Sequence, residues 1–400
     1  MYLGGFIHRD KLFQIAMRWL GDQLEPDDAW NVSEIFAYEG FVSGNPIKSF
    51  ITSFLEELHG QKIENRYVSY KHQVKEAVVR HIPDPDSRMD FLVKNFKSRP
   101  EEYFPRAPFN GLMMYTETND LVGMYRIKRA RRVAEKVSRR MADLILDNIR
   151  NHAKRLAQGR ASMLGIPFDT LLSTGEEMVN EFEIAERRLA EQFTSGEIPF
   201  AQDDIAIHDT IGIKVIGTPE ILKKAEELLI NHPDLAWVER EIHSGSYNAV
   251  NVQVDLKLPP PQQIVDRVLN RIVPPFPLSR GISLENLIEG FPGYVESGAR
   301  TIRLEIILTT YPELIESEIG RSIHEERTLK QRKQREYTGR IAKNAEFIIE
   351  YLLSVAFSPK IDINFIPVKL SGHYLPETVS HAIRKLYGLD ESALFANLTF

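Results

Sequence analysis

The 400-residue chain contains no cysteine. Disulfide bridges, thiolate metal sites and cysteine nucleophiles are therefore excluded. Long apolar runs are also missing, because no stretch approaches the roughly 20 residues that a helix needs to cross a bilayer. Residues 1–30 carry charges every few positions and do not read as a secretory signal. These absences predict a cytoplasmic protein with no membrane association.

A large excess of charge of either sign is absent as well. The formal net charge is −6 and the pI is near 6.1, so the chain as a whole is not a nucleic-acid binder and any such role needs a local patch. The composition, 43% hydrophobic and 26% charged, is that of an ordinary globular protein. The length predicts two or three domains.

The N-terminal region, residues 1–120, contains apolar residues at helical spacing but no phosphate loop, metal-ligand spacing or nucleophile elbow. The expected elements are helices at 10–20, from Pro46 to Gly60 and at 68–81, and a proline-rich connection at 98–110. We therefore expect a helical accessory domain here.

The most basic segment, residues 125–160, has apolar residues that fit one long amphipathic helix. Its first part, from Arg126 to Arg140, contains many arginines and lysines but only one acidic residue, Glu135. Two interpretations stay open. The charges either form a solvated helix face or contact a polyphosphate or an RNA backbone.

A strand, helix, strand, strand pattern follows from residue 205 to residue 258, and another strand is expected at 300–308. Asp209 lies within the first of these strands, and Glu305 lies on the polar face of the last. Hard divalent cations such as Mg²⁺ take oxygen ligands, so two carboxylates on neighbouring strands are typical of a metal-dependent phosphate-transfer site. An aspartate at a strand end also caps turns, so this alternative stays open for Asp209.

Four segments in the same order resemble motifs of the RelA/SpoT-like nucleotidyltransferases, the alarmone synthetases. They are HDTIGIKVIG (208–217), GSYNAVNVQV (245–254), RLEIILTT (303–310) and SEIGRSIHEER (317–327). The resemblance covers roughly residues 180–330 and implies an α/β (α+β) fold with a mixed sheet flanked by helices. With it the chain divides into a helical accessory domain (1–120), the basic helix and a linker (121–175), the synthetase-like domain (176–330), and a C-terminal helix with a tail (331–400).

The resemblance also implies site roles and ligands. Asp209 and Glu305 would be the catalytic carboxylates that bind Mg²⁺, with ATP as the donor and a nucleotide as the acceptor. Tyr247 would stack on the purine of the acceptor, although a cross-strand aromatic is an equally open interpretation. Nucleotide contacts would also come from Lys214, Asn251 and His324.

The departures from the family pattern concern mainly the phosphate contacts. The family serine and histidine are Ala249 and Asn251 here, and its glutamine and arginine are Ile307 and Thr309. The helix expected just before Asp209 supplies only Arg187 and Arg188 of the cations that hold ATP. The spacing of the family's cationic residues is matched instead by Arg126, Lys128 and Lys136, more than seventy residues before Asp209.

Three functions are therefore compatible with the sequence. The first is pyrophosphate transfer from ATP to a nucleotide. The second is pyrophosphate transfer to the 3′ end of tRNA, which the basic stretch Arg126–Arg140 favours through RNA contact. The third is a catalytically degenerate protein that binds nucleotides or a partner. A metal phosphohydrolase using His208 and Asp209 is disfavoured, because that chemistry needs further ligands on neighbouring helices.

Overall fold

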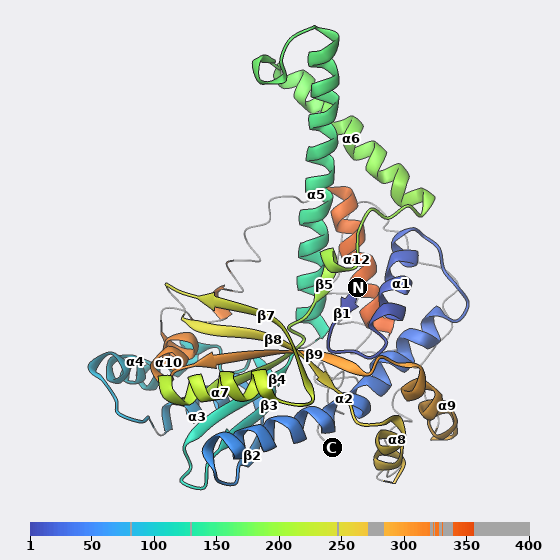
Figure 1. Ribbon diagram of the computed structural model, residues 1–400. Helices are drawn as coiled ribbons and strands as arrows, with labels where there is room; N and C mark the ends of the chain where they lie inside the picture. Colours follow the sequence, from blue (N-terminus) through green and yellow to red (C-terminus); the bar gives the residue numbers. More distant parts are fainter. Residues whose placement is uncertain are drawn as a thin grey trace.

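The computed structural model describes residues 1–80, 82–128, 130–245, 248–270, 284–320, 323, 325–327, 330 and 339–355. Its centre is a seven-stranded mixed sheet with the strand order β2-β3-β4-β6-β9-β8-β7, and helices cover both of its faces (Figure 1). Strands β6 and β9 are parallel, and every other neighbouring pair in this sheet is antiparallel. The expected α+β fold with a mixed sheet is therefore confirmed.

The strands of this sheet come from both halves of the chain. They are β2 (Glu64–Tyr70), β3 (Pro108–Tyr115), β4 (Leu121–Ile127), β6 (Ile211–Ile216), β7 (Leu235–His243), β8 (Ala249–Lys257) and β9 (Thr301–Thr309). A separate two-stranded parallel sheet pairs β1 (Tyr2–Leu3) with β5 (Ala206–Ile207).

The helices vary from short connections to the 34-residue α5. They are α1 (Arg9–Leu20), α2 (Asp28–His59), α3 (Lys71–Arg80), α4 (Ser87–Ser98), α5 (Ala130–Met163), α6 (Gly175–Ser195), α7 (Pro219–Asn231), α8 (Pro261–Leu269), α9 (Leu284–Ser297), α10 (Tyr311–Ile319) and α12 (Arg340–Val355), with short 3-10 turns at Pro100–Tyr103, Phe168–Thr170 and Asp203–Ile205.

Strand β9 shows how side-chain alternation assigns the two faces of the sheet. Ile302, Leu304 and Ile306 are fully buried in the larger hydrophobic core, which includes residues of α2, α5 and α12. The intervening residues point to the opposite face, as a strand requires. A smaller core on that face is built from α3, α4, α10 and the strands beneath them. Glu305 therefore lies on the face opposite the larger core, as its position in the sequence predicted.

Residues 1–120 are mostly helical, as expected, but they also contain strands β2 and β3, which were not expected and which pair antiparallel with each other. The helix expected at 68–81 begins only at Lys71, because residues 64–70 form β2. The helix predicted to start at Pro46 begins instead at Asp28 and continues through Pro46. Its length is explained by burial, because most residues between Val32 and Leu58 pack into the interior and tertiary packing outweighs the local cost of proline.

The basic segment, residues 125–160, was predicted as one long helix, and this prediction is wrong for its first residues. Arg126 and Ile127 end strand β4, and the helix begins only at Ala130. The strand expected from residue 205 divides into β5 and β6, and the helix that follows β9, α10, ends at Ile319.

Several other expected elements are confirmed, namely α1, α6, α7, the β7–β8 pair and α12. The division into four domains stays a prediction. Strands from before residue 120 and from after residue 175 belong to the same seven-stranded sheet. Among the described residues, every helix is too short or too polar to cross a bilayer.

Candidate functional site

The candidate site forms where the end of β4 meets the start of β6. The Lys128 backbone N–H donates to the carbonyl of Thr210 at 2.8 Å, which extends the β4–β6 pairing beyond the strands. The Arg140 guanidinium, from α5, donates to the Ala206 carbonyl in β5. These two bonds hold Asp209, which lies between β5 and β6, against the first turns of α5.

Two lysines converge on the Asp209 carboxylate. Lys128 Nζ lies 2.7 Å from Asp209 Oδ2, and Lys136 Nζ contacts the same oxygen. Lys128 also donates to the Asp209 backbone carbonyl. Lys136 lies two turns along α5 from the strand end, so a strand residue and a helix residue reach the aspartate together.

The pairing strongly perturbs the ionisation of Asp209 and Lys128. Burial alone would raise the pKa of Asp209, but the charges of Lys128 and Lys136 hold it well below its usual range. Burial lowers the pKa of Lys128 to about 8, and the negative charges of Asp209 and Glu305 oppose this shift. The Lys128 side chain is only 8% exposed. A buried lysine that loses its proton near neutral pH is typical of functional sites.

Beside this cluster, an arginine and a glutamate lie on either side of a glycine across three adjacent strands. Arg126 on β4, Gly212 on β6 and Glu305 on β9 occupy the same register on three adjacent strands. A Cβ atom added at Gly212 would lie 3.6 Å from Arg126 Nε and 3.6 Å from Glu305 Oε2. The missing side chain therefore leaves the space between a guanidinium and a carboxylate open.

Asn251 supports the second carboxylate. Its Nδ2 donates to Glu305 Oε1 at 3.3 Å across the β8–β9 pair. Gln253, two residues further along β8, pairs directly with Glu305 in the strand register. This amide thus holds Glu305 in place.

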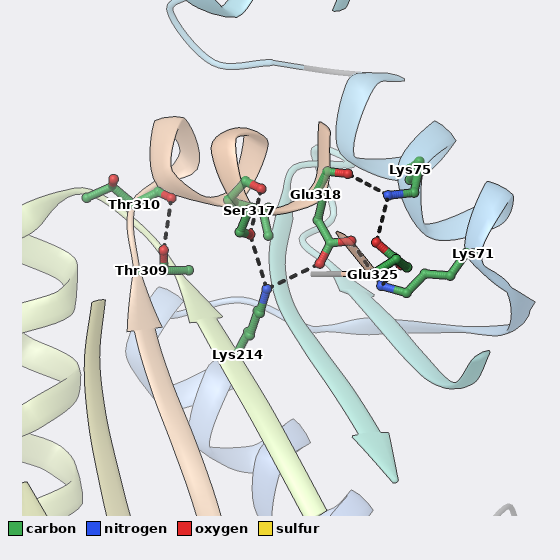
Figure 2. A network of polar contacts seen from close by, with 9 residues as sticks. Lys71, Lys75, Lys214, Thr309, Thr310, Ser317, Glu318 and Glu325 are labelled. Carbon is green, nitrogen blue, oxygen red and sulfur yellow. Dashed lines mark hydrogen bonds and ion pairs between the residues drawn. The ribbon is translucent and has the colours of Figure 1, made fainter. Parts of the chain in front are cut away.

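A buried ion network lies on the same face of the sheet, two residues along β6 from Gly212. Figure 2 shows Lys214, Lys71 and Lys75 around Glu318 and Glu325. The distances to Glu318 are 3.3 Å from Lys214 Nζ and 3.1 Å from Lys71 Nζ. Glu325 lies 3.1 Å from Lys71 Nζ and 3.5 Å from Lys75 Nζ. Lys75 also donates to the Glu318 backbone carbonyl.

The network joins α3 to α10 beside the candidate site. Burial would raise the pKa of Glu318, but Lys71, Lys214 and Lys75 hold it well below its usual range. Burial lowers the pKa of Lys214 and of Lys75, although Glu318 opposes the shift in both. Arg126 adds a further positive charge that acts on Lys71 and Lys214. The network and the candidate site therefore form one electrostatic unit.

The predicted site residues do not all meet here. The structure brings together Asp209, Glu305, Asn251, Arg126, Lys128 and Lys136, and it places Lys214 in the adjacent ion network. Arg187 and Arg188 are exposed on α6, in the helical hairpin that extends away from the sheet (Figure 1). Arg188 approaches His152 of α5 at 3.5 Å. Tyr247 and His324 lie outside the described residues.

The sequence interpretation missed Lys71 and Lys75, since residues before 120 had been assigned to a separate helical domain. Their spacing of four on an otherwise buried helix face was the available signal, because two lysines on an apolar face need buried partners. Arg140 had been assigned only to a basic surface, yet it fixes β5 through the Ala206 carbonyl.

The expected Mg²⁺ can be compared with the donor groups present. Within the described part of the chain, no group of three or more histidine, aspartate or glutamate side chains could hold a metal ion. Mg²⁺ is, however, commonly bound by one or two carboxylates together with substrate phosphates and water. Asp209 and Glu305 supply such a pair, and both act on Lys128. Two carboxylates are thus present as oxygen donors, and the described residues form no cluster of three or more that could hold a metal ion by themselves.

Comparison with known proteins gives little beyond this geometry. No family model and no curated protein matches the chain. Among solved structures, the chain is similar to the small alarmone synthetase 1 from Bacillus subtilis, with 12% sequence identity and a TM-score of 0.19. The likeness covers 38% of this chain and 59% of the synthetase chain, which is less than two thirds of its length. At this level the likeness does not identify what this chain does.

Proposed function

We propose that this protein transfers a diphosphate group from ATP to a hydroxyl group of a nucleotide. The observation that carries the proposal is the convergence of Arg126, Lys128 and Lys136 on Asp209 and Glu305. Their contacts join residues 73 and 81 positions apart in the sequence. The three cations have the family's spacing, and the fold returns them to the carboxylates in spite of that separation.

The separation has a structural explanation. Between the basic residues and Asp209 the chain forms the hairpin of α5 and α6, which leaves the body of the protein and returns to it (Figure 1). The segment proposed to hold the ATP phosphates therefore lies beside Asp209. This basic segment runs into the long helix α5. The hairpin of α5 and α6 separates it from Asp209 in the sequence, but the two lie next to each other in the fold.

The charges also suit the chemistry. A transferring phosphoryl group carries negative charge on its oxygens, and cations that are fixed before the reaction stabilise that charge at little reorganisation cost. Arg126 offers a planar set of donors, and Lys128 and Lys136 offer point charges. Once a nucleotide displaces the internal ion pairs, these side chains would grip its phosphates while Glu305 faces the acceptor.

The proposed step is an in-line displacement at the β-phosphorus of ATP. The acceptor hydroxyl oxygen forms a new bond to that phosphorus, the bond from the β-phosphorus to the α–β bridging oxygen breaks, and AMP leaves. The hydroxyl proton passes to the Glu305 carboxylate, which Asn251 orients through its amide. When bound, Mg²⁺ held by Asp209, Glu305 and the phosphates would neutralise charge on the transferring group.

The test is incubation of the purified protein with ATP labelled at the γ-phosphate and with GDP, GTP or tRNA as acceptor. Label in a nucleotide product, lost in the Lys128→Met variant and kept in Lys223→Met, is the expected result. Lys223 is an exposed lysine of α7 and serves as the matched control. Label in tRNA alone would replace the nucleotide acceptor with RNA, and label in no product would overturn the proposal.

A second candidate, a nucleotide-binding protein without turnover, is favoured by one observation. Asp209 is already neutralised by two lysines, and Ile307 and Thr309 stand where the family has polar residues. Calorimetric titration with ATP separates the two functions. Binding that weakens in Lys136→Met, together with no transfer to any acceptor, would support this second function.

A further inference from the structure

The hairpin of α5 and α6 presents an exposed apolar tip that the proposed reaction does not use. At 34 residues, α5 is roughly 51 Å long at 1.5 Å per residue. Figure 1 shows its second half and α6 extending beyond the other described elements. Beyond Ile149, the buried residues of α5 are Ala157 and Ala161, so few side chains of α5 are buried in this part of the hairpin.

Large hydrophobic side chains gather at this tip. Met163 is 91% exposed and Leu172 is 94% exposed. Exposed apolar residues continue through Leu164, Ile166, Phe168, Met178 and Val179. Patches of this kind mark interaction surfaces in proteins that remain in solution, because isolated exposed hydrophobic residues are common but contiguous ones are not. The tip therefore needs a covering partner.

The charges of the hairpin indicate which partner fits. The distal part of α5 carries Arg150, Lys154, Arg155 and Arg160, and no acidic residue lies between Asp147 and Asp169. The facing part of α6 has the opposite sign, with five glutamates before its first arginine. These are Glu176, Glu177, Glu181, Glu183 and Glu186.

Some of this charge is paired within one hairpin. Arg160 contacts Glu177 at 2.7 Å and Glu181 at 3.0 Å. Lys154 and Arg155 on α5, and Glu176 and Glu183 on α6, are exposed. One helix thus offers a basic edge and its neighbour an acidic edge, both next to the apolar tip.

We propose that the hairpin pairs with the hairpin of a second copy of this chain, forming a four-helix bundle around a two-fold axis parallel to the helices. In this arrangement α5 of one copy faces α6 of the other on both sides of the axis, so basic and acidic edges meet twice. The two apolar tips meet at the axis. Pairing α5 with α5 would instead oppose like charges, and pairing the hairpins in opposite directions would separate the tips.

The charge arrangement gives a specific test by analytical ultracentrifugation of the full chain. One variant carries Lys154→Glu and Arg155→Glu, and the other carries Glu176→Lys and Glu183→Lys. Each variant alone would oppose like charges across the axis, so its dimer should dissociate at least about tenfold more readily than that of the wild type. An equimolar mixture should form heterodimers, since the altered helices are then complementary. Dimers that persist in either variant, or a mixture that stays monomeric, would overturn the proposal.

The apolar tip is tested separately. Leu172→Glu should weaken the dimer at least about tenfold, whereas Ile230→Glu, at a 57% exposed position on α7, should leave it unchanged. Circular dichroism would verify that both variants remain folded. A wild-type chain that is monomeric throughout the micromolar range would refute the dimer, as would a monomer whose tip binds vesicles of phosphatidylcholine and phosphatidylglycerol.

Discussion

Replacing Asp209 with asparagine should destabilise the protein by an amount that depends on pH. The substitution keeps the size of the side chain but removes the negative charge that faces Lys128 and Lys136. Lys128 is nearly buried and would remain as a desolvated ammonium facing a neutral amide. A buried charge without its counter-ion is costly, whereas Lys136, which is more exposed, can turn toward water.

The structure sets the size of this effect. At 2.7 Å and an effective dielectric constant of about 20, the Lys128–Asp209 attraction is roughly 6 kcal/mol. Desolvation of both ions offsets most of this, so a net coupling of about 1–3 kcal/mol is expected from a double-mutant cycle with Lys128→Met. The Asp209→Asn substitution alone should cost about 3 kcal/mol near pH 6, at the lower end for broken buried pairs because the Asp209 side chain is 23% exposed.

The sign of the pH dependence follows from the pKa of Lys128, which burial lowers from the ordinary lysine value of 10.5 to about 8 in the folded protein. Below pH 8 the folded protein carries the charged lysine, so losing Asp209 has its full effect. Above pH 8 Lys128 becomes neutral in the folded wild type, and the difference between wild type and variant should shrink. Urea unfolding at pH 6 and pH 9 measures both values. An equal loss of stability at the two pH values, or a coupling below about 0.5 kcal/mol, would refute this account.

Three further predictions concern the same face of the sheet. If the protein transfers phosphate, kcat/KM for ATP should fall as pH rises through about 8, since the free protein then loses the charge of Lys128; a flat pH–rate profile would contradict this. Gly212→Ala should be tolerated because its Cβ meets ordinary contact distances of 3.6 Å, whereas Gly212→Leu should abolish ATP binding, measured by calorimetry, without lowering the melting temperature. Glu318→Gln should cost about 3 kcal/mol or more in urea unfolding, because it removes the carboxylate that pairs with the buried Lys214 and one of the two that pair with Lys71. Glu316→Gln, which removes a partner of the exposed Arg88, should cost less than about 1 kcal/mol, and equal losses for the two glutamates would contradict the assignment.

The parts of the site that could be predicted are those with strong local signals. Glu305 interrupts a strand whose alternate residues, Ile302 to Leu308, are apolar, so the face of the carboxylate followed from the period of a β-strand. Asp209 was predicted within one continuous strand, whereas it lies between β5 and β6. Lys71 and Lys75 could not be assigned, because their partners Glu318 and Glu325 lie more than 240 residues away along the chain.

The sequence by itself determined the α+β class, the assignment of β9 to its two faces and the charges available for the site, because these depend on residue types and short-range periodicity. Only the tertiary structure decided that Lys128 and Lys136 reach Asp209. The resemblance implies phosphate contacts for residues of the basic segment, which lie more than seventy residues before Asp209. The structure brings the two segments together because the intervening residues fold as the hairpin of α5 and α6. The pairing of β4 beside β6 then brings the two ends together, a long-range contact that no local pattern encodes.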